Sequence, residues 1–121
     1  MWNASWEPRF AYDNSPSYSY RDFNEVPWYN CYAGISSAND GLVAIAGDPA
    51  FFGDNTAKVH AFAKWVQELC HCWLAINFDK AFIFDESVNI ETDVLDFQPY
   101  GAVMDAGIGM LEECITICNA N

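Results

Sequence analysis

Apolar residues recur at helical spacing in two stretches of the chain. When residues 55 to 77 are placed at steps of about 100°, the apolar ones occupy an arc of about 200°, wide enough for packing on more than one side. The residues left outside this arc are polar: His60, Lys64, Gln67, Glu68 and His71. Residues 102 to 119 also share one apolar face, with Asp105 and Glu112 opposite it. The pattern therefore predicts two amphipathic helices, about 55–77 and 102–119.

Two other stretches have the residue types and spacing of β-hairpins. Residues 28 to 35 and 42 to 46 are aromatic, β-branched or small, and the segment SSANDG between them has turn chemistry. Apolar and polar residues then alternate from 88 to 94, after the apolar run AFIF at 81 to 84. We expect an α+β fold of one domain, residues 1–121, in which an antiparallel sheet from the two hairpins packs against the two helices.

Residues 1 to 30 form an aromatic-rich segment without helical periodicity. Residues 1 to 32 contain ten of the twenty aromatic side chains of the chain, and Pro8, Pro16 and Pro27 interrupt them. We therefore expect irregular chain in this segment. Two interpretations of the rings remain open: they cover the core, or they form an exposed surface for a partner.

The net charge of −12, from 17 acidic and 5 basic residues, changes the functional expectation. A surface this acidic repels nucleic acid and anionic membranes, so neither is an expected direct partner. The charge is also uneven, because residues 79 to 121 carry nine acids and one base. Strand geometry would place Glu91 and Asp93 on one outer face, and a clustered acidic surface favours a basic partner.

The candidate partner-binding residues are carboxylates of this region: Asp85, Glu86, Glu91, Asp93, Asp96, Asp105 and Glu112. In size and charge the chain resembles the DNA mimics and the anti-CRISPR and anti-restriction inhibitors of phages and mobile elements. That resemblance implies a small non-enzymatic inhibitor that docks on a basic surface of a nucleic-acid-binding protein or complex. The alternative explanation is that the acidic residues serve solubility alone.

The histidines and cysteines lack the spacing of known metal sites. His60 and His71 would lie about 16 Å apart along a helix, too far to share a ligand. Three cysteines fall in the predicted apolar arcs, where a thiol packs as a small apolar side chain: Cys70, Cys114 and Cys118. We therefore expect no metal and no cofactor, although whether these cysteines ever bind metal stays open. No nucleophile in a recognisable context accompanies either histidine, so we expect no enzyme activity.

Two other functions remain open. A small-ligand-binding domain or hydrolase would use His60 or His71 with a carboxylate, and a structural or accessory subunit of a phage or virus assembly would use the N-terminal aromatics as an interface. The first ten residues lack the pattern of a secretory signal, and no apolar run is long enough to span a bilayer. We expect a cytoplasmic protein, in the host cytoplasm if a phage encodes it. The oligomeric state stays open, with a dimer among the possibilities.

Overall fold

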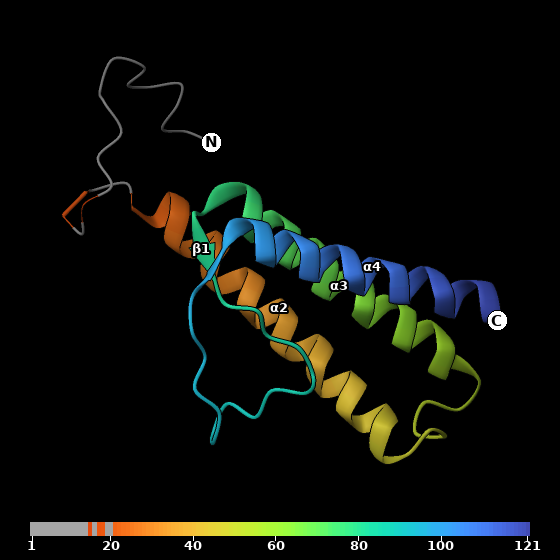
Figure 1. The fold of residues 1–121 in the computed structure, drawn as a ribbon. Coiled ribbons are helices and arrows are strands. Elements are labelled where there is room, and N and C mark those ends of the chain that lie inside the picture. The colour runs from red at the N-terminus through yellow and green to blue at the C-terminus, as the bar shows by residue number, and fades with distance from the viewer. Residues whose placement is uncertain (1–14, 16, 19–20) are drawn as a thin grey trace. The chain divides into compact units, whose positions relative to one another are not determined.

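The computed structural model describes residues 15, 17, 18 and 21–121 of the chain. The chain divides into two compact units, residues 1–30 and residues 31–121. The elements follow in the order α2 (Asp22–Gly47), the 3₁₀ turn η1 (Gly53–Asn55), α3 (Thr56–Asn77), β1 (Lys80–Ala81), β2 (Gln98–Pro99) and α4 (Tyr100–Ala120) (Figure 1). The part of the chain that the structure describes is therefore mostly helical.

The expected α+β fold with two hairpins is wrong. Between residues 21 and 121 the strand content is a single two-residue antiparallel pair, in which Lys80 lies opposite Pro99 and Ala81 opposite Gln98. Both predicted helices are confirmed, since α3 and α4 begin and end within two residues of the expected bounds. The additional helix, α2, occupies the stretch expected to be the first hairpin.

The helix α2 forms because its apolar residues are spaced for burial on one side. Ile35, Ala38 and Leu42 follow at intervals of three and four residues and are all buried. Ala38 and Leu42 form a core cluster with Ala63 of α3. This burial outweighs the turn chemistry of the segment around Asn39, because tertiary packing of an apolar face supplies most of the stability of a protein helix.

The second predicted hairpin does not form, because the apolar residues of its alternating stretch, 88 to 94, are not buried against any other part of the described chain. Residues 82–97, which we call the anchored loop, form irregular chain with short turns between β1 and β2. Its apolar residues Ile90 and Val94 are 68% and 88% exposed. Alternation of apolar and polar residues stabilises a strand only when one face is buried, and no part of the described chain covers these apolar side chains.

Glycine allows α3 and α4 to approach closely. A Cβ built at Gly107 would lie 2.8 Å from Cys72 Sγ and 3.3 Å from the Cys72 backbone nitrogen. Gly107 is buried in the contact between the two helices, and Leu74 of α3 and Val103 of α4 are fully buried. In Figure 1, α3 and α4 run side by side over most of their length.

The irregular segment predicted for residues 1–30 is wrong for its last part, because α2 begins at Asp22. Most of residues 1–21 lie outside the described residues, and so do five of the rings in question: Trp2, Trp6, Phe10, Tyr12 and Tyr20. Within α2, Phe23 and Tyr29 are exposed. No helix in the described ranges combines the length and the apolar run that crossing a bilayer requires.

Candidate functional site: an anchored acidic loop

Tyr32 of α2 holds the base of the anchored loop. Its hydroxyl donates to the carbonyl oxygen of Phe82 at 3.1 Å and accepts from the Phe82 backbone N–H at 2.7 Å. The Phe82 ring in turn stacks on Phe97, at the other end of the loop, with ring centroids 4.1 Å apart. Burial raises the pKa of Tyr32 to about 12, so the hydroxyl keeps its proton and both hydrogen bonds at physiological pH. The two ends of the loop are thus held together on α2.

His71 of α3 forms the next anchor and is fully buried. Its Nε2 accepts the backbone N–H of Phe84 at 3.2 Å, which requires that Nδ1 carries the proton. Nδ1 then donates to the Gln67 carbonyl oxygen at 2.7 Å. Burial lowers the pKa of His71 by more than the Gln67 hydrogen bond and nearby Asp85 raise it, so the ring is neutral.

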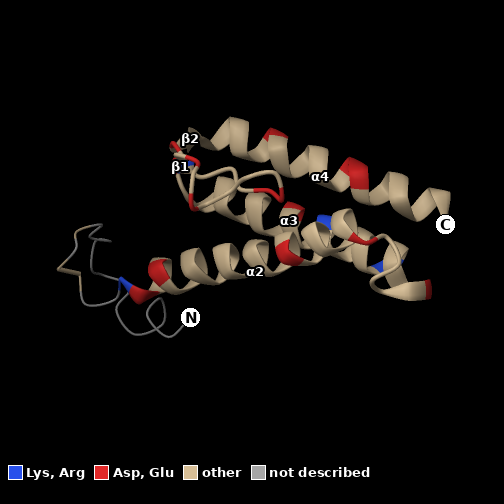
Figure 2. Ribbon diagram, turned by 90° about the horizontal axis from the view of Figure 1, so that it is seen from below, with Lys and Arg blue, Asp and Glu red and all other residues tan. Residues whose placement is uncertain are grey.

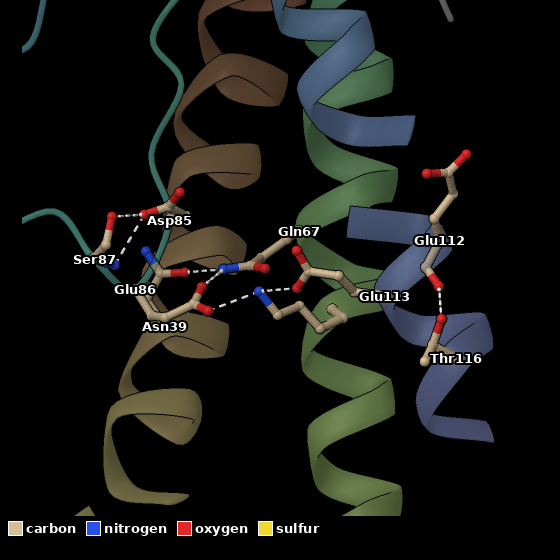
Figure 3. Close-up of polar contacts among 9 residues, drawn as sticks. Asn39, Gln67, Asp85, Glu86, Ser87, Glu112, Glu113 and Thr116 are labelled. Carbon is tan, nitrogen blue, oxygen red and sulfur yellow. Dashed lines mark hydrogen bonds and ion pairs between the residues drawn. The ribbon is translucent and has the colours of Figure 1, made fainter. Parts of the chain in front are cut away.

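A buried lysine forms the third anchor. The Lys64 side chain is 7% exposed, and its Nζ lies 2.7 Å from Glu86 of the loop and 2.7 Å from Glu113 of α4. Gln67 donates to the second Glu86 oxygen at 2.8 Å and to Asn39 of α2 at 2.6 Å. In Figure 3, Asn39, Gln67, Glu86 and Glu113 converge from three helices and the loop. The cluster therefore ties the loop to all three helices.

Charges in this cluster stabilise one another. Burial lowers the pKa of Lys64, but its hydrogen bonds to Glu113 and Glu86 outweigh burial, so the pKa lies above its ordinary value. Burial raises the pKa of Glu86, whereas the hydrogen bonds from Gln67 and Lys64 lower it by more. Both groups are therefore charged at neutral pH, as a buried ion pair requires.

Beyond Glu86 the loop is shaped by its own side chains. Asp85 Oδ1 accepts from the backbone N–H of Ser87 at 2.9 Å, and Asn89 Oδ1 accepts from that of Glu91 at 3.0 Å. Asp93 Oδ2 accepts from the backbone N–H of Asn89 at 2.8 Å. Such side-chain turns replace the hydrogen bonds that a strand partner would supply.

The tip of the loop combines exposed carboxylates with exposed apolar side chains. Glu91, Asp93 and Asp96 are exposed, and so are Ile90 and Val94, which neighbour them in the sequence. Figure 2 shows acidic positions along the chain that joins β1 and β2 and also on α4. A surface with an apolar centre and charged neighbours is typical of a protein-binding site rather than of a purely solvated segment.

The structure separates the predicted site residues into three groups. Glu91, Asp93 and Asp96 are exposed along the second half of the anchored loop, whereas Asp85 caps a turn and Glu86 belongs to the lysine cluster. The other two predicted residues, Asp105 and Glu112, are exposed on α4 and lie outside the loop. Figure 3 shows Glu112 directed away from the cluster that Glu113 enters.

Three of the polar residues that the sequence pattern placed outside the apolar arc of α3 are buried in the structure. The buried ones are Lys64, Gln67 and His71, and all three hold the anchored loop. Their spacing of three and four residues is the signal that could have identified them, because it places them in one polar line along the helix. Glu113 carried no such signal.

Cysteines and metal ligands do not assemble into a further site. All five cysteines are free thiols. Cys70 is half-buried beside Cys31, and burial raises the pKa of Cys31 to about 11. Cys118, which the apolar pattern placed inside, is exposed. Between residues 21 and 121, no three His, Cys, Asp or Glu side chains come together as metal ligands would.

Comparison with protein-family models, with curated proteins and with solved structures finds no match to this chain. Its function is therefore inferred from the contacts, exposure and charges of its own residues.

Proposed function

We propose that this chain is a non-enzymatic binding protein whose anchored loop docks on a basic protein surface and blocks it. The observation that carries the proposal is the exposure of Ile90 and Val94 among Glu91, Asp93 and Asp96, on a loop whose base is tied down. Solubility alone accounts for exposed carboxylates but not for two large apolar side chains at the tip.

The anchors favour binding by lowering its entropic cost. Tyr32, His71 and Lys64 hold the first residues of the loop at positions 82, 84 and 86, and its other end is held where Phe97 stacks on Phe82. A segment held in this way loses less conformational freedom when it docks than a free segment does. The carboxylates would steer a basic partner towards the tip, and the apolar side chains would then be buried in the contact.

The basic partner that fits best is one that binds nucleic acid. Its surface would carry Lys and Arg placed for phosphates, and carboxylates a few ångströms apart can occupy the same places. Such partners and the five free thiols of this chain are both typical of the cytoplasm, which we propose as its location.

Catalysis by the histidines has less support. Both ring nitrogens of His71 are engaged, one with Gln67 and one with Phe84. His60 is half-buried near the start of α3, far along the helix from His71. A general base needs a free nitrogen that reaches the substrate, which His71 would provide only if the loop left it.

The test is affinity capture from cell lysate with the purified protein, followed by elution in a rising salt gradient and mass spectrometry. We expect a basic nucleic-acid-binding protein to elute, and DNA or RNA to compete with its capture. Changing Glu91, Asp93 and Asp96 to Lys should abolish the capture.

The matched control reverses three exposed carboxylates elsewhere, Asp22, Asp40 and Asp54, and changes the net charge by the same amount. Capture that survives the loop changes, or that both variants lose equally, would contradict the proposed role of the loop. A circular dichroism spectrum like that of the unaltered protein must accompany either result.

A further inference from the structure

Four large apolar side chains of α3 form an exposed line on the helix. They are Phe62, Trp65, Leu69 and Ile76, and they are between 42% and 74% exposed. Their spacing of three, four and seven residues places them on one side of α3. The line is about 21 Å long at the helical rise, or four turns of helix.

Two residues of α4 extend this line into a surface. Ile108 and Ile115 are seven residues apart and about half-exposed. Met104 of the same helix joins Ile76 in the lining of a pocket of about 400 Å³, so the two helices present their apolar side chains side by side there. We name the six exposed residues the α3–α4 apolar face: Phe62, Trp65, Leu69, Ile76, Ile108 and Ile115.

This face lies on the opposite side of the two helices from the anchored loop. The Lys64–Glu113 ion pair marks the loop side, and Gly107 against Cys72 marks the contact between the helices. When the residues of α3 are placed at steps of about 100°, Cys72 at the helix contact lies about 80° round from Lys64 of the ion pair. The exposed apolar line lies further round in the same direction. The same order holds round α4: Glu113 marks the loop side, Gly107 marks the helix contact, and the two isoleucines lie on the exposed face.

Charges border the α3–α4 apolar face on its outer side. Asp105 and Glu112 are exposed on α4, each three residues before one of the isoleucines. Asp79 lines the pocket beside Ile76, at the end of α3. At the opposite end, Lys58 lines a second pocket with Phe62. Most of the border is thus acidic and complements basic residues.

We propose that the α3–α4 apolar face binds one amphipathic helix of a partner protein, with Lys or Arg along the edges of its apolar side. The six side chains leave on the order of 500 Å² of apolar surface exposed, which matches the apolar part of a helix of about four turns. This interface is separate from the anchored loop and holds whether or not the loop has the function proposed above.

A second copy of this chain fits the face less well. Two copies would bring two acidic borders into one interface, and each copy has a net charge of −12. Like charges facing one another across an interface oppose association. The acidic border therefore selects a basic helix over a homodimer.

The test is selection from a displayed library of helical peptides about 18 residues long, with the full-length protein as target. We expect enrichment of peptides with Leu, Ile or Phe at positions i, i+3, i+4 and i+7 and with Lys or Arg beside them. An enriched peptide is then synthesised, and its affinity for the protein is measured by titration calorimetry.

Four variants locate the binding. Leu69→Glu should weaken it by at least about tenfold, and the milder Leu69→Ala should weaken it measurably if the glutamate disturbs folding. Val43→Glu, an equally exposed change on α2, should leave the affinity within about twofold. Asp105→Lys with Glu112→Lys should reduce the preference for basic peptides.

Three outcomes would overturn the proposal. They are enrichment of no peptide or of acidic ones, affinity that Leu69→Glu and Leu69→Ala leave unchanged, and a concentration-dependent dimer in sedimentation that Leu69→Glu dissociates. The last outcome would assign the face to a second copy of the chain.

Discussion

The close approach of α3 and α4 at Gly107 predicts that a side chain at this position strains the contact between the two helices. In Gly107→Ala the new methyl group would lie 2.8 Å from Cys72 Sγ, 3.3 Å from the Cys72 nitrogen and 3.4 Å from the Glu68 carbonyl oxygen. The sulfur atom can rotate away, but the two backbone atoms belong to α3 and move only with the helix. The helices must therefore separate by a few tenths of an ångström.

The expected magnitude follows from two opposing effects. Overpacking a helix contact costs about 1–3 kcal/mol. Replacing glycine by alanine inside a helix stabilises it by about 1 kcal/mol. Gly107→Ala should thus lower the free energy of unfolding by about 0–2 kcal/mol.

Gly109 provides the matched control on the same helix. A Cβ built there meets no atom within 4 Å. Gly109→Ala should therefore gain the higher helix propensity of alanine without any overpacking and stabilise the protein by about 1 kcal/mol. The two variants should then differ by about 1–3 kcal/mol in urea unfolding followed by far-ultraviolet circular dichroism. Equal stability of the two variants would refute the described packing of α3 against α4. Adding Cys72→Ala to Gly107→Ala should recover part of the loss, because it removes only the sulfur contact.

Three further predictions concern the anchors of the loop. Tyr32→Phe removes both hydrogen bonds to Phe82, so hydrogen exchange of the Phe82 amide should accelerate and stability should fall by about 1–3 kcal/mol; unchanged exchange would contradict the clamp. Lys64→Met leaves Glu86 and Glu113 without their cation and should lower the free energy of unfolding by about 1–3 kcal/mol. The loss is smaller than for a fully buried pair because both carboxylates are partly exposed. Adding Glu86→Gln should restore part of the lost stability in the same urea assay. The pKa of His71 is lowered in the folded state, so the folded state binds a proton at this residue less well than the unfolded state does. The contribution of His71 to stability is therefore full above pH 6.5, and it is lost as pH falls through the lower pKa of the folded state. His71→Gln should flatten the fall in stability that begins as pH drops below about 6.5, whereas the contribution of Glu86 is lost only below its ordinary pKa of 4.5.

Local sequence pattern was sufficient for the two amphipathic helices. The apolar residues of α3 and α4 repeat over five turns or more, and a signal of that length survives a few unfavourable residues such as Gly107. Net charge and its concentration after residue 79 also follow from the sequence alone. These properties depend on residue identity and spacing, which the chain carries without its fold.

The first and second predicted hairpins failed because local and tertiary preferences disagree there. The segment around Asn39 has turn residues, but Ile35, Ala38 and Leu42 gain burial against α3 only as a helix. The stretch around Val94 alternates like a strand, yet between residues 21 and 121 it has no neighbouring strand and no apolar surface to cover. In both cases the deciding factor was which surface lay opposite, and a local pattern does not contain it.

The sequence by itself determined where two helices form, how acidic the chain is and that its carboxylates are concentrated after residue 79. Only the tertiary structure decided which polar residues are buried, because Lys64, Gln67 and His71 become interior when the anchored loop closes over α3. It also decided that Glu86 is an internal ion-pair partner while Glu91 and Asp93 remain exposed. Burial depends on contacts between segments far apart in the chain, and such contacts exist only once the segments have packed.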